Sequence, residues 1–297
     1  EAREPGLALA RLKLGWLKPP KVPADGVMSL GDHLREFRYR VVISALAILL
    51  GMVVCAFFNR EILGFMLIPW NEAQAIIKGK HENLDVQIVL QNVTSPLVLV
   101  LRVVAMGGLV LTSPFWLYQV WAYLRPALLR AEKKYALAFI GAAVPLFLFG
   151  CALGFVVLPQ GISLLLSFTP DQLHVVNQIH VDDFLVLVMQ LMLIFGLGFL
   201  LPLVVVALNL VGLLSGATLK KSRKGVVFGC FVFAGALTPG GDPFSMLALS
   251  LPMMILFLVA EMICHANDKR RAKRLAAAEA AEAAETAARL GQAAIQA

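Results

Sequence analysis

The sequence predicts an all-α integral membrane protein with six transmembrane helices in a bent, concave bundle. The 297-residue chain is 59% hydrophobic and only 15% charged, whereas a soluble domain has about 25% charged residues. Its apolar residues come in blocks with almost no charge that are at least as long as a membrane-crossing helix, which needs about 17–25 residues. Its basic residues gather in alternate connections between these blocks, and such positive connections stay in the cytoplasm.

Six apolar blocks account for the six predicted spans: 41–58, 86–124, 136–170, 184–219, 225–241 and 243–260. The third and fourth blocks are too long for one upright helix and too short for two, so each is interpreted as a tilted span with an apolar flank. The fifth and sixth spans are predicted to be short helices. Pro145, Pro202 and Pro252 lie inside predicted spans, where proline kinks a helix. These kinks and short spans predict the bend of the bundle.

The basic residues predict the orientation of the chain. Most of the 26 Lys and Arg residues lie before the first span, in the connections around 124–139 and 220–224, and in the C-terminal tail. Both termini are therefore predicted to be cytoplasmic, that is, N-in and C-in. The net charge of +7 is interpreted as a topology signal and an attraction to anionic lipids, and not as a nucleic-acid-binding surface.

The chain is expected to divide into three segments. Residues 1–27 are predicted to form a disordered basic tail, residues 28–266 the six-helix membrane domain, and residues 267–297 a charged, Ala-rich cytoplasmic tail. Two connections on the opposite side, 59–95 and 159–183, are predicted to be structured. Together they are expected to form an extracytoplasmic cap over one face of the bundle.

The sequence contains no catalytic, phosphate-binding or metal-binding motif. The four cysteines lack CxxC spacing and the five histidines lack ligand spacing, so a metal site or a disulfide framework is not expected. We therefore predict a protein that is not an enzyme and that uses no cofactor.

Two acidic residues, Glu36 and Glu132, are each outnumbered by basic neighbours just before a predicted span. One interpretation is a local salt bridge, worth about 0–1 kcal/mol when exposed. The other is a two-carboxylate receptor for a cationic ligand, because a guanidinium group can pair with a carboxylate through two hydrogen bonds. The spacing alone leaves both interpretations open.

Two further charges lie within or near the spans. Arg102 is interpreted as snorkelling towards the outer edge of the membrane, with the alternative that it faces protein or water. Glu261, near the cytoplasmic end of the last span, is interpreted as reaching the membrane interface. The third and fourth spans carry no charge at all, which argues against a proton-coupled small-molecule transporter.

Three motifs resemble the TatC family, which is the core receptor of the twin-arginine protein translocase. They are SLGDHLREFRYRVVIS (29–44), FWLYQVWAYLRPALLRAEKK (115–134) and LTPGGDPFSMLALSLPM (237–253). The resemblance covers about residues 28–274, and the middle motif is the most specific. It implies the same six-span layout and a non-enzymatic transport function in the bacterial cytoplasmic (inner) membrane.

The resemblance also implies what the chain binds. The expected ligands are twin-arginine signal peptides of folded proteins, bound at the cytoplasmic face, and the expected partners are single-span TatA- and TatB-type proteins. The chain is expected to act as a homo-oligomer within that complex, driven by the proton-motive force. The residues expected to bind the signal peptide are Glu36, Glu132, Arg38, Gln119, Tyr123, Arg130 and Lys134. The residues assigned to structure or partner docking are Pro69, Pro126, Arg102, Leu200, Asp242, Phe244, Ser245 and Glu261.

Two positions depart from the family pattern. The family commonly has a Glu inside the fourth span, in a pattern like FGxxFExP, whereas this chain reads FGLGFLLP (195–202) with Leu200 in that place. The family often has a Glu in the sixth span where this chain has Leu258, and the nearest acid is Glu261, one turn later. Either a step inside the membrane is lost, or Glu261 substitutes for the missing acid.

Two other functions stay open, namely a multispan small-molecule transporter and a membrane scaffold that does not transport. A receptor requires both Glu36 and Glu132. A scaffold would bind its single-span partners without either carboxylate.

Overall fold

The computed structural model describes residues 30–80, 86–90, 92–124, 132–168, 177–238 and 243–296. Within these ranges nearly every residue is helical, and the predicted all-α membrane class is confirmed. Two four-residue strands are the exception. The elements in chain order are α1 (Leu30–Ala56), α2 (Asn59–Met66), α3 (Ile68–Lys80), β1 (Val86–Val89), α4 (Ser95–Leu111), α5 (Ser113–Leu124), α6 (Glu132–Leu166), β2 (Asn177–His180), α7 (Val181–Val211), α8 (Gly216–Lys221), α9 (Arg223–Leu237) and α10 (Pro243–Gln296).

The apolar blocks of the sequence become helices of very different length. Among the described residues, α1, α6, α7 and α10 are long and apolar enough to cross a membrane, and the bent pair α4–α5 makes a fifth span if it is counted as one. The remaining block forms α9, which has 15 residues. At 1.5 Å per residue it is about 22 Å long, which is shorter than the ~30 Å hydrocarbon core of a bilayer. Six spans therefore stay a prediction.

The second apolar block is broken into two helices. α4 begins at Ser95, and it meets α5 at an angle of 59°. Pro114 follows the break directly, and proline both removes a backbone donor and clashes with the preceding turn. The indole N–H of Trp116 donates to the carbonyl oxygen of Leu109 at 3.0 Å, so a side chain spans the break.

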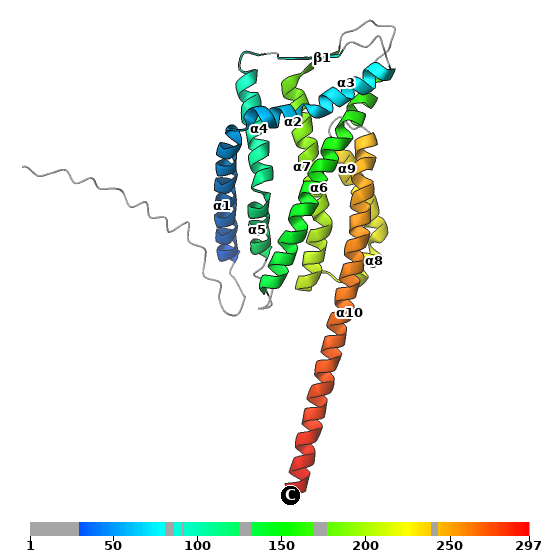
Figure 1. Cartoon of the computed structure of the whole chain (residues 1–297). Coiled ribbons are helices and arrows are strands. Elements are labelled where there is room, and N and C mark those ends of the chain that lie inside the picture. The colour runs from blue at the N-terminus through cyan, green and yellow to red at the C-terminus, as the bar shows by residue number, and fades with distance from the viewer. Residues whose placement is uncertain are drawn as a thin grey trace, which may run out of the picture. The chain divides into compact units, whose positions relative to one another are not determined.

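The described chain forms two compact units. The first contains the chain up to Ile62 together with Val100–Val144. In this unit α1 approaches the pair α4–α5 very closely (Figure 1). A Cβ atom added to Gly108 of α4 would lie only 2.7 Å from the backbone nitrogen of Met52 in α1. The two backbones therefore touch at a site that accepts no larger residue.

The second unit contains Leu63–Leu99 and Pro145–Ala297. Here α6 and α7 also approach each other closely at a glycine. A Cβ atom on Gly150 would lie only 2.6 Å from the carbonyl oxygen of Phe195. Phe147 and Phe195 are fully buried beside this crossing. The close contact lets the two aromatic side chains fill the interface.

α10 supplies an apolar stripe to the second unit and then leaves it. Its buried residues recur every three or four positions, which places them on one face of the helix, and α10 packs against α7 and α9. These residues are Leu249, Met253, Phe257, Ala260 and Cys264. The helix continues without a break to Gln296 and extends beyond the ends of α7 and α9 (Figure 1). The expectation of a short sixth helix is therefore wrong, because the Ala, Glu, Lys and Arg of the tail are strong helix formers.

The two connections expected on the outer side are joined by a short sheet. β1 pairs with β2 in parallel, with Val86 opposite Asn177. α2 and α3 occupy the first connection, and Trp70 of α3 packs edge-on against Phe184 of α7, with ring centroids 5.7 Å apart. Both connections are thus structured, while their role as a cap over one face of a membrane bundle stays a prediction.

The three prolines expected to kink the bundle all lie within helices. Pro145, Pro202 and Pro252 each lie inside a helix that continues on both sides. The N-terminal tail 1–27 lies outside the described residues.

Candidate functional site

Glu36 is a buried carboxylate near the start of α1. It is 3% exposed, although its neighbours Arg35, Phe37 and Arg38 are exposed. Residues four apart lie on the same face of a helix, and this face of α1 packs against α5. Glu36 therefore points into the first unit together with Arg40, one turn later.

Arg40 is the counterion of Glu36. Its Nε and one terminal nitrogen donate to Oε1 of Glu36 at 2.9 and 2.5 Å. Its other terminal nitrogen donates to the side-chain oxygen of Gln119 on α5 at 3.0 Å. Gln119 is itself buried, so three buried or half-buried side chains from two helices form one hydrogen-bonded chain.

The second oxygen of Glu36 is left free. Oε2 is buried and has no hydrogen-bond partner within the part of the chain that the structure describes. A buried polar atom without a partner costs about 1–3 kcal/mol, and more when it is charged. The fold therefore holds an anionic acceptor that a ligand's N–H group would satisfy.

Aromatic side chains lie at the same end of α1. The ring of Tyr123 from α5 stacks on His33, with centroids 4.5 Å apart and planes at 22°, and it meets Phe37 at 5.4 Å. Phe37 is 49% exposed. Because aromatic faces attract cations, this cluster and the carboxylate of Glu36 suit a positively charged, partly apolar ligand.

The structure brings together some of the residues predicted to bind a ligand and separates others. Glu36, Gln119 and Tyr123 lie on the facing parts of α1 and α5. Arg38 is exposed on another face of α1. Arg40, two residues further on, takes the central position that the sequence analysis leaves without a role.

Several predicted residues cannot be placed in this cluster. Glu132 is the first residue of α6 and Lys134 the third, and their side chains lie outside what the structure describes, as do Pro126 and Arg130. The expectation that Glu132 completes a two-carboxylate site therefore stays a prediction.

The second unit contains another paired acid. Glu261 of α10 is buried, and Arg223 of α9 donates two hydrogen bonds to its carboxylate, Nε to Oε2 at 2.9 Å and a terminal nitrogen to Oε1 at 2.6 Å. Arg223 itself is half exposed, so its removal would leave the buried carboxylate without these two donors. The pair therefore fixes the start of α9 against α10.

The other residues assigned to structure or partner docking are distributed over the chain. Pro69 is buried at the second position of α3, and Arg102 is half-buried in the second turn of α4. Phe244 and Ser245 begin α10, the first exposed and the second buried. Leu200 is half-buried in α7. Asp242 lies outside the described residues.

The described residues contain no group of three or more His, Cys, Asp or Glu side chains that could hold a metal ion. The residues missed by the sequence analysis are Arg40, His33 and Phe37. The signal that could have found Arg40 is its spacing of four from Glu36, which places an oppositely charged pair on one helix face.

Three comparisons relate the chain to known proteins. The family model described as Sec-independent protein translocase protein (TatC) matches residues 32–252. The Sec-independent protein translocase protein TatC of Frankia casuarinae is 37% identical over 84% of this chain and 69% of its own length. That of Xylanimonas cellulosilytica is 35% identical over 85% of this chain and 89% of its own. A crystal structure titled twin arginine translocase receptor TatC in DDM aligns with a TM-score of 0.64 at 26% identity, over 78% of this chain and 99% of that one.

Proposed function

Because the chain belongs to the TatC family of Sec-independent protein translocase proteins, we propose that it is a receptor for twin-arginine signal peptides of folded proteins. The family consists of protein translocase components, so the chain is a membrane transport protein and not an enzyme. Its ligand, the residues that bind this ligand and its partner proteins are proposed below from the geometry around Glu36 and from the resemblance to the family.

The observation that carries the proposal is the buried carboxylate of Glu36. Its Oε1 is occupied by Arg40, while its Oε2 is buried and has no partner within the described residues. The exposed ring of Phe37, the next residue on α1, packs against the half-buried ring of Tyr123 on α5. An incoming guanidinium group would gain a charge-assisted hydrogen bond from Oε2 and a stacking surface from the rings.

This site would favour Arg over Lys in a signal peptide. The guanidinium group is planar, stacks on aromatic rings and presents several N–H donors in a fixed fork. The ammonium group of Lys is a compact, strongly hydrated charge that cannot make the same set of contacts.

A pair of consecutive arginines needs two acceptors, and Glu132, at the start of α6, is the residue proposed to supply the second. Arg38, Arg130 and Lys134 are proposed to line the path of the peptide.

The proposed setting is the bacterial cytoplasmic membrane. The chain is proposed to cross it six times with both termini in the cytoplasm, which the distribution of Lys and Arg supports. It is proposed to work as one of several copies, together with single-span TatA- and TatB-type proteins and the proton-motive force. Pro69, Phe244 and Ser245 are the described residues proposed to support docking of those partners.

A binding experiment tests the receptor proposal directly. Purified protein in nanodiscs is titrated with a twin-arginine signal peptide and with the same peptide carrying Lys-Lys in place of the Arg pair. We expect the Lys-Lys peptide, and the Glu36→Gln and Glu132→Gln proteins, to bind roughly tenfold more weakly or worse, because a hydrogen bond to a charged group contributes about 1.5–3 kcal/mol.

Glu279→Gln is the matched control, because Glu279 is an exposed carboxylate in the C-terminal part of α10. Its affinity for the twin-arginine peptide should equal that of the unmodified protein. Equal affinity for the Arg-Arg and Lys-Lys peptides would contradict the proposal. The protein would then be a scaffold, or its recognition site would need a partner subunit.

A further inference from the structure

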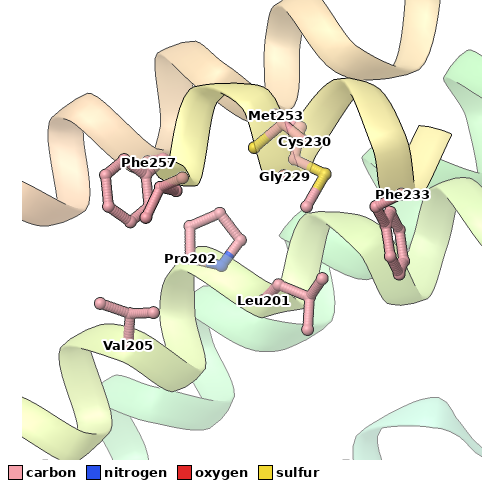
Figure 2. Close-up of a pocket in the computed structure, with 9 residues that line it drawn as sticks. Leu201, Pro202, Val205, Gly229, Cys230, Phe233, Met253 and Phe257 are labelled. Carbon is pink, nitrogen blue, oxygen red and sulfur yellow. The ribbon is translucent and has the colours of Figure 1, made fainter. Parts of the chain in front are cut away.

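An apolar pocket lies among α7, α9 and α10 in the second unit (Figure 2). Its volume is about 270 Å³. Pro202 of α7, Gly229 and Cys230 of α9, and Met253 and Phe257 of α10 contribute to its walls. The missing side chain at Gly229 leaves part of this space unfilled, because a Cβ atom there would meet no other atom within 4 Å.

The pocket is suited to an alkyl chain. Cavities lined by apolar groups bind apolar guests, and an engineered cavity of about 150 Å³, smaller than this pocket, binds benzene. Gly229 is exposed and Leu201 is 40% exposed, so the pocket opens to the surface of its unit.

Basic residues lie near one end of the pocket. Arg223 and Glu261 form their ion pair one turn away from the pocket residues Val226 and Phe257. Because Glu261 balances the charge of Arg223, the surplus positive charge comes from the lysines next to it. These are Lys220 and Lys221 at the end of α8 and Lys224 at the start of α9, all of them exposed.

We propose that this pocket binds one acyl chain of an anionic phospholipid, whose phosphate headgroup contacts Lys220. Charge complementarity selects the headgroup, since basic residues at a membrane surface attract anionic lipids. The apolar walls select the chain. The site belongs to different elements from the carboxylate at Glu36 and does not depend on the signal-peptide proposal. In the orientation proposed above, the lipid belongs to the cytoplasmic leaflet.

Two glycines of α9 provide a matched pair of variants. Gly225 and Gly229 lie one turn apart, and a Cβ atom at either would meet no other atom within 4 Å. Only Gly229 lines the pocket. Gly229→Leu is therefore expected to fill the pocket without disturbing the helix packing, whereas Gly225→Leu adds the same side chain outside it.

The test uses phosphatidylglycerol and phosphatidylcholine that carry the same photoreactive acyl chain. Each lipid is built into nanodiscs with the full-length protein, illuminated, and mapped on the protein by peptide mass spectrometry. We expect phosphatidylglycerol to label peptides that contain Cys230 or Phe257, more strongly than phosphatidylcholine does. Gly229→Leu should abolish this labelling, and Gly225→Leu should retain it.

The lysines test the headgroup separately from the pocket. Lys220→Gln should lower the labelling by phosphatidylglycerol roughly fivefold, towards the level of phosphatidylcholine, because one basic residue near the membrane surface contributes about 1 kcal/mol, while Lys273→Gln in the α10 tail should leave it unchanged. Equal labelling by both lipids in the unmodified protein would overturn the proposal. So would labelling that persists in Gly229→Leu, or pocket labelling that an added single-span helical protein removes, because a helix would then be the occupant.

Discussion

At the scale of single residues, Arg40 is the counterion of the buried carboxylate of Glu36. Arg40 is half-buried and makes two hydrogen bonds to Glu36 and one to Gln119. Its removal would leave a buried charge with no counterion, and removing one partner of a buried pair costs about 3–5 kcal/mol. Because Arg40 leaves Oε2 of Glu36 free, it also orients the oxygen proposed to receive the ligand.

Arg40→Gln should therefore lower both stability and affinity for the twin-arginine peptide. We expect a loss of about 3 kcal/mol in the free energy of unfolding, measured as a lower unfolding midpoint of the purified protein in detergent. Arg38→Gln is the control, because Arg38 is exposed, and its midpoint should not move. A Glu36→Gln and Arg40→Gln double variant should regain stability but not peptide binding. A stable Arg40→Gln protein would show that the pair contributes little.

The sequence identifies three of the side chains in this cluster and misses the one at its centre. Glu36, Gln119 and Tyr123 lie in motifs that resemble the family. Arg38 and Arg40 lie in the same basic segment, and only the helical period shows that they lie on different faces of α1. Arg40 shares a face with Glu36 and Arg38 does not. The exposure of each arginine depends on where α5 packs, and the sequence of α1 alone does not contain that information.

Glycine contacts give a second prediction at this scale. Gly150→Ala would bring a methyl group within 2.6 Å of the backbone carbonyl oxygen of Phe195, so α6 and α7 would have to separate. Overpacking of this kind costs about 1–3 kcal/mol, and the unfolding midpoint in detergent should fall. Gly141→Ala on the same helix meets no atom within 4 Å, and it should be neutral or slightly stabilising because Ala favours the helix. Equal effects of the two changes would contradict this explanation.

At the scale of elements, a polar clamp joins α7, α8 and α10 where α10 leaves the second unit. Asp268 of α10 accepts hydrogen bonds from the side chain of Asn209 at 2.8 Å and from the backbone N–H of Gly216 at 2.6 Å. Asn209 is 2% exposed and also donates to the carbonyl of Leu214. The clamp ties the short helix α8 to two long ones.

Asp268→Ala should release α8. Each hydrogen bond to a charged group contributes about 1.5–3 kcal/mol, and α8 has only six residues, too few to be stable without such contacts. We expect faster amide hydrogen exchange across residues 216–221 and unchanged exchange in α6. Glu279→Ala, an exposed change in the same helix, is the control. Unchanged exchange in α8 would mean that apolar packing of Leu219, which is 4% exposed, holds it instead.

Element boundaries show where prediction from composition ends. α6 and α7 are single helices as expected. The break between α4 and α5 and the length of α10 are different cases. The hydrophobicity of the second block does not show that the block is bent near Pro114. Hydropathy falls at the charged tail, although α10 continues through that tail to Gln296.

At the scale of the whole molecule, the number of membrane crossings depends on α9. Its 15 residues reach about 22 Å, so it can cross only where the bilayer is thinned or the protein is tilted. If α9 crosses, the ends of α7 and α10 that flank it lie on opposite sides. If it does not, the chain crosses an odd number of times and its termini lie on opposite sides.

Cysteine accessibility distinguishes the two topologies. The four native cysteines are buried, so they should give little background with a membrane-impermeant maleimide. Leu213→Cys lies before α8 and Phe244→Cys at the start of α10, and both positions are exposed. We expect the reagent to label Phe244→Cys in intact spheroplasts and Leu213→Cys only after lysis, because the basic residues of α8 and α9 should stay in the cytoplasm. Labelling of both positions in intact spheroplasts, or of neither, would mean that α9 returns to the side it came from, and the six-span proposal would be wrong.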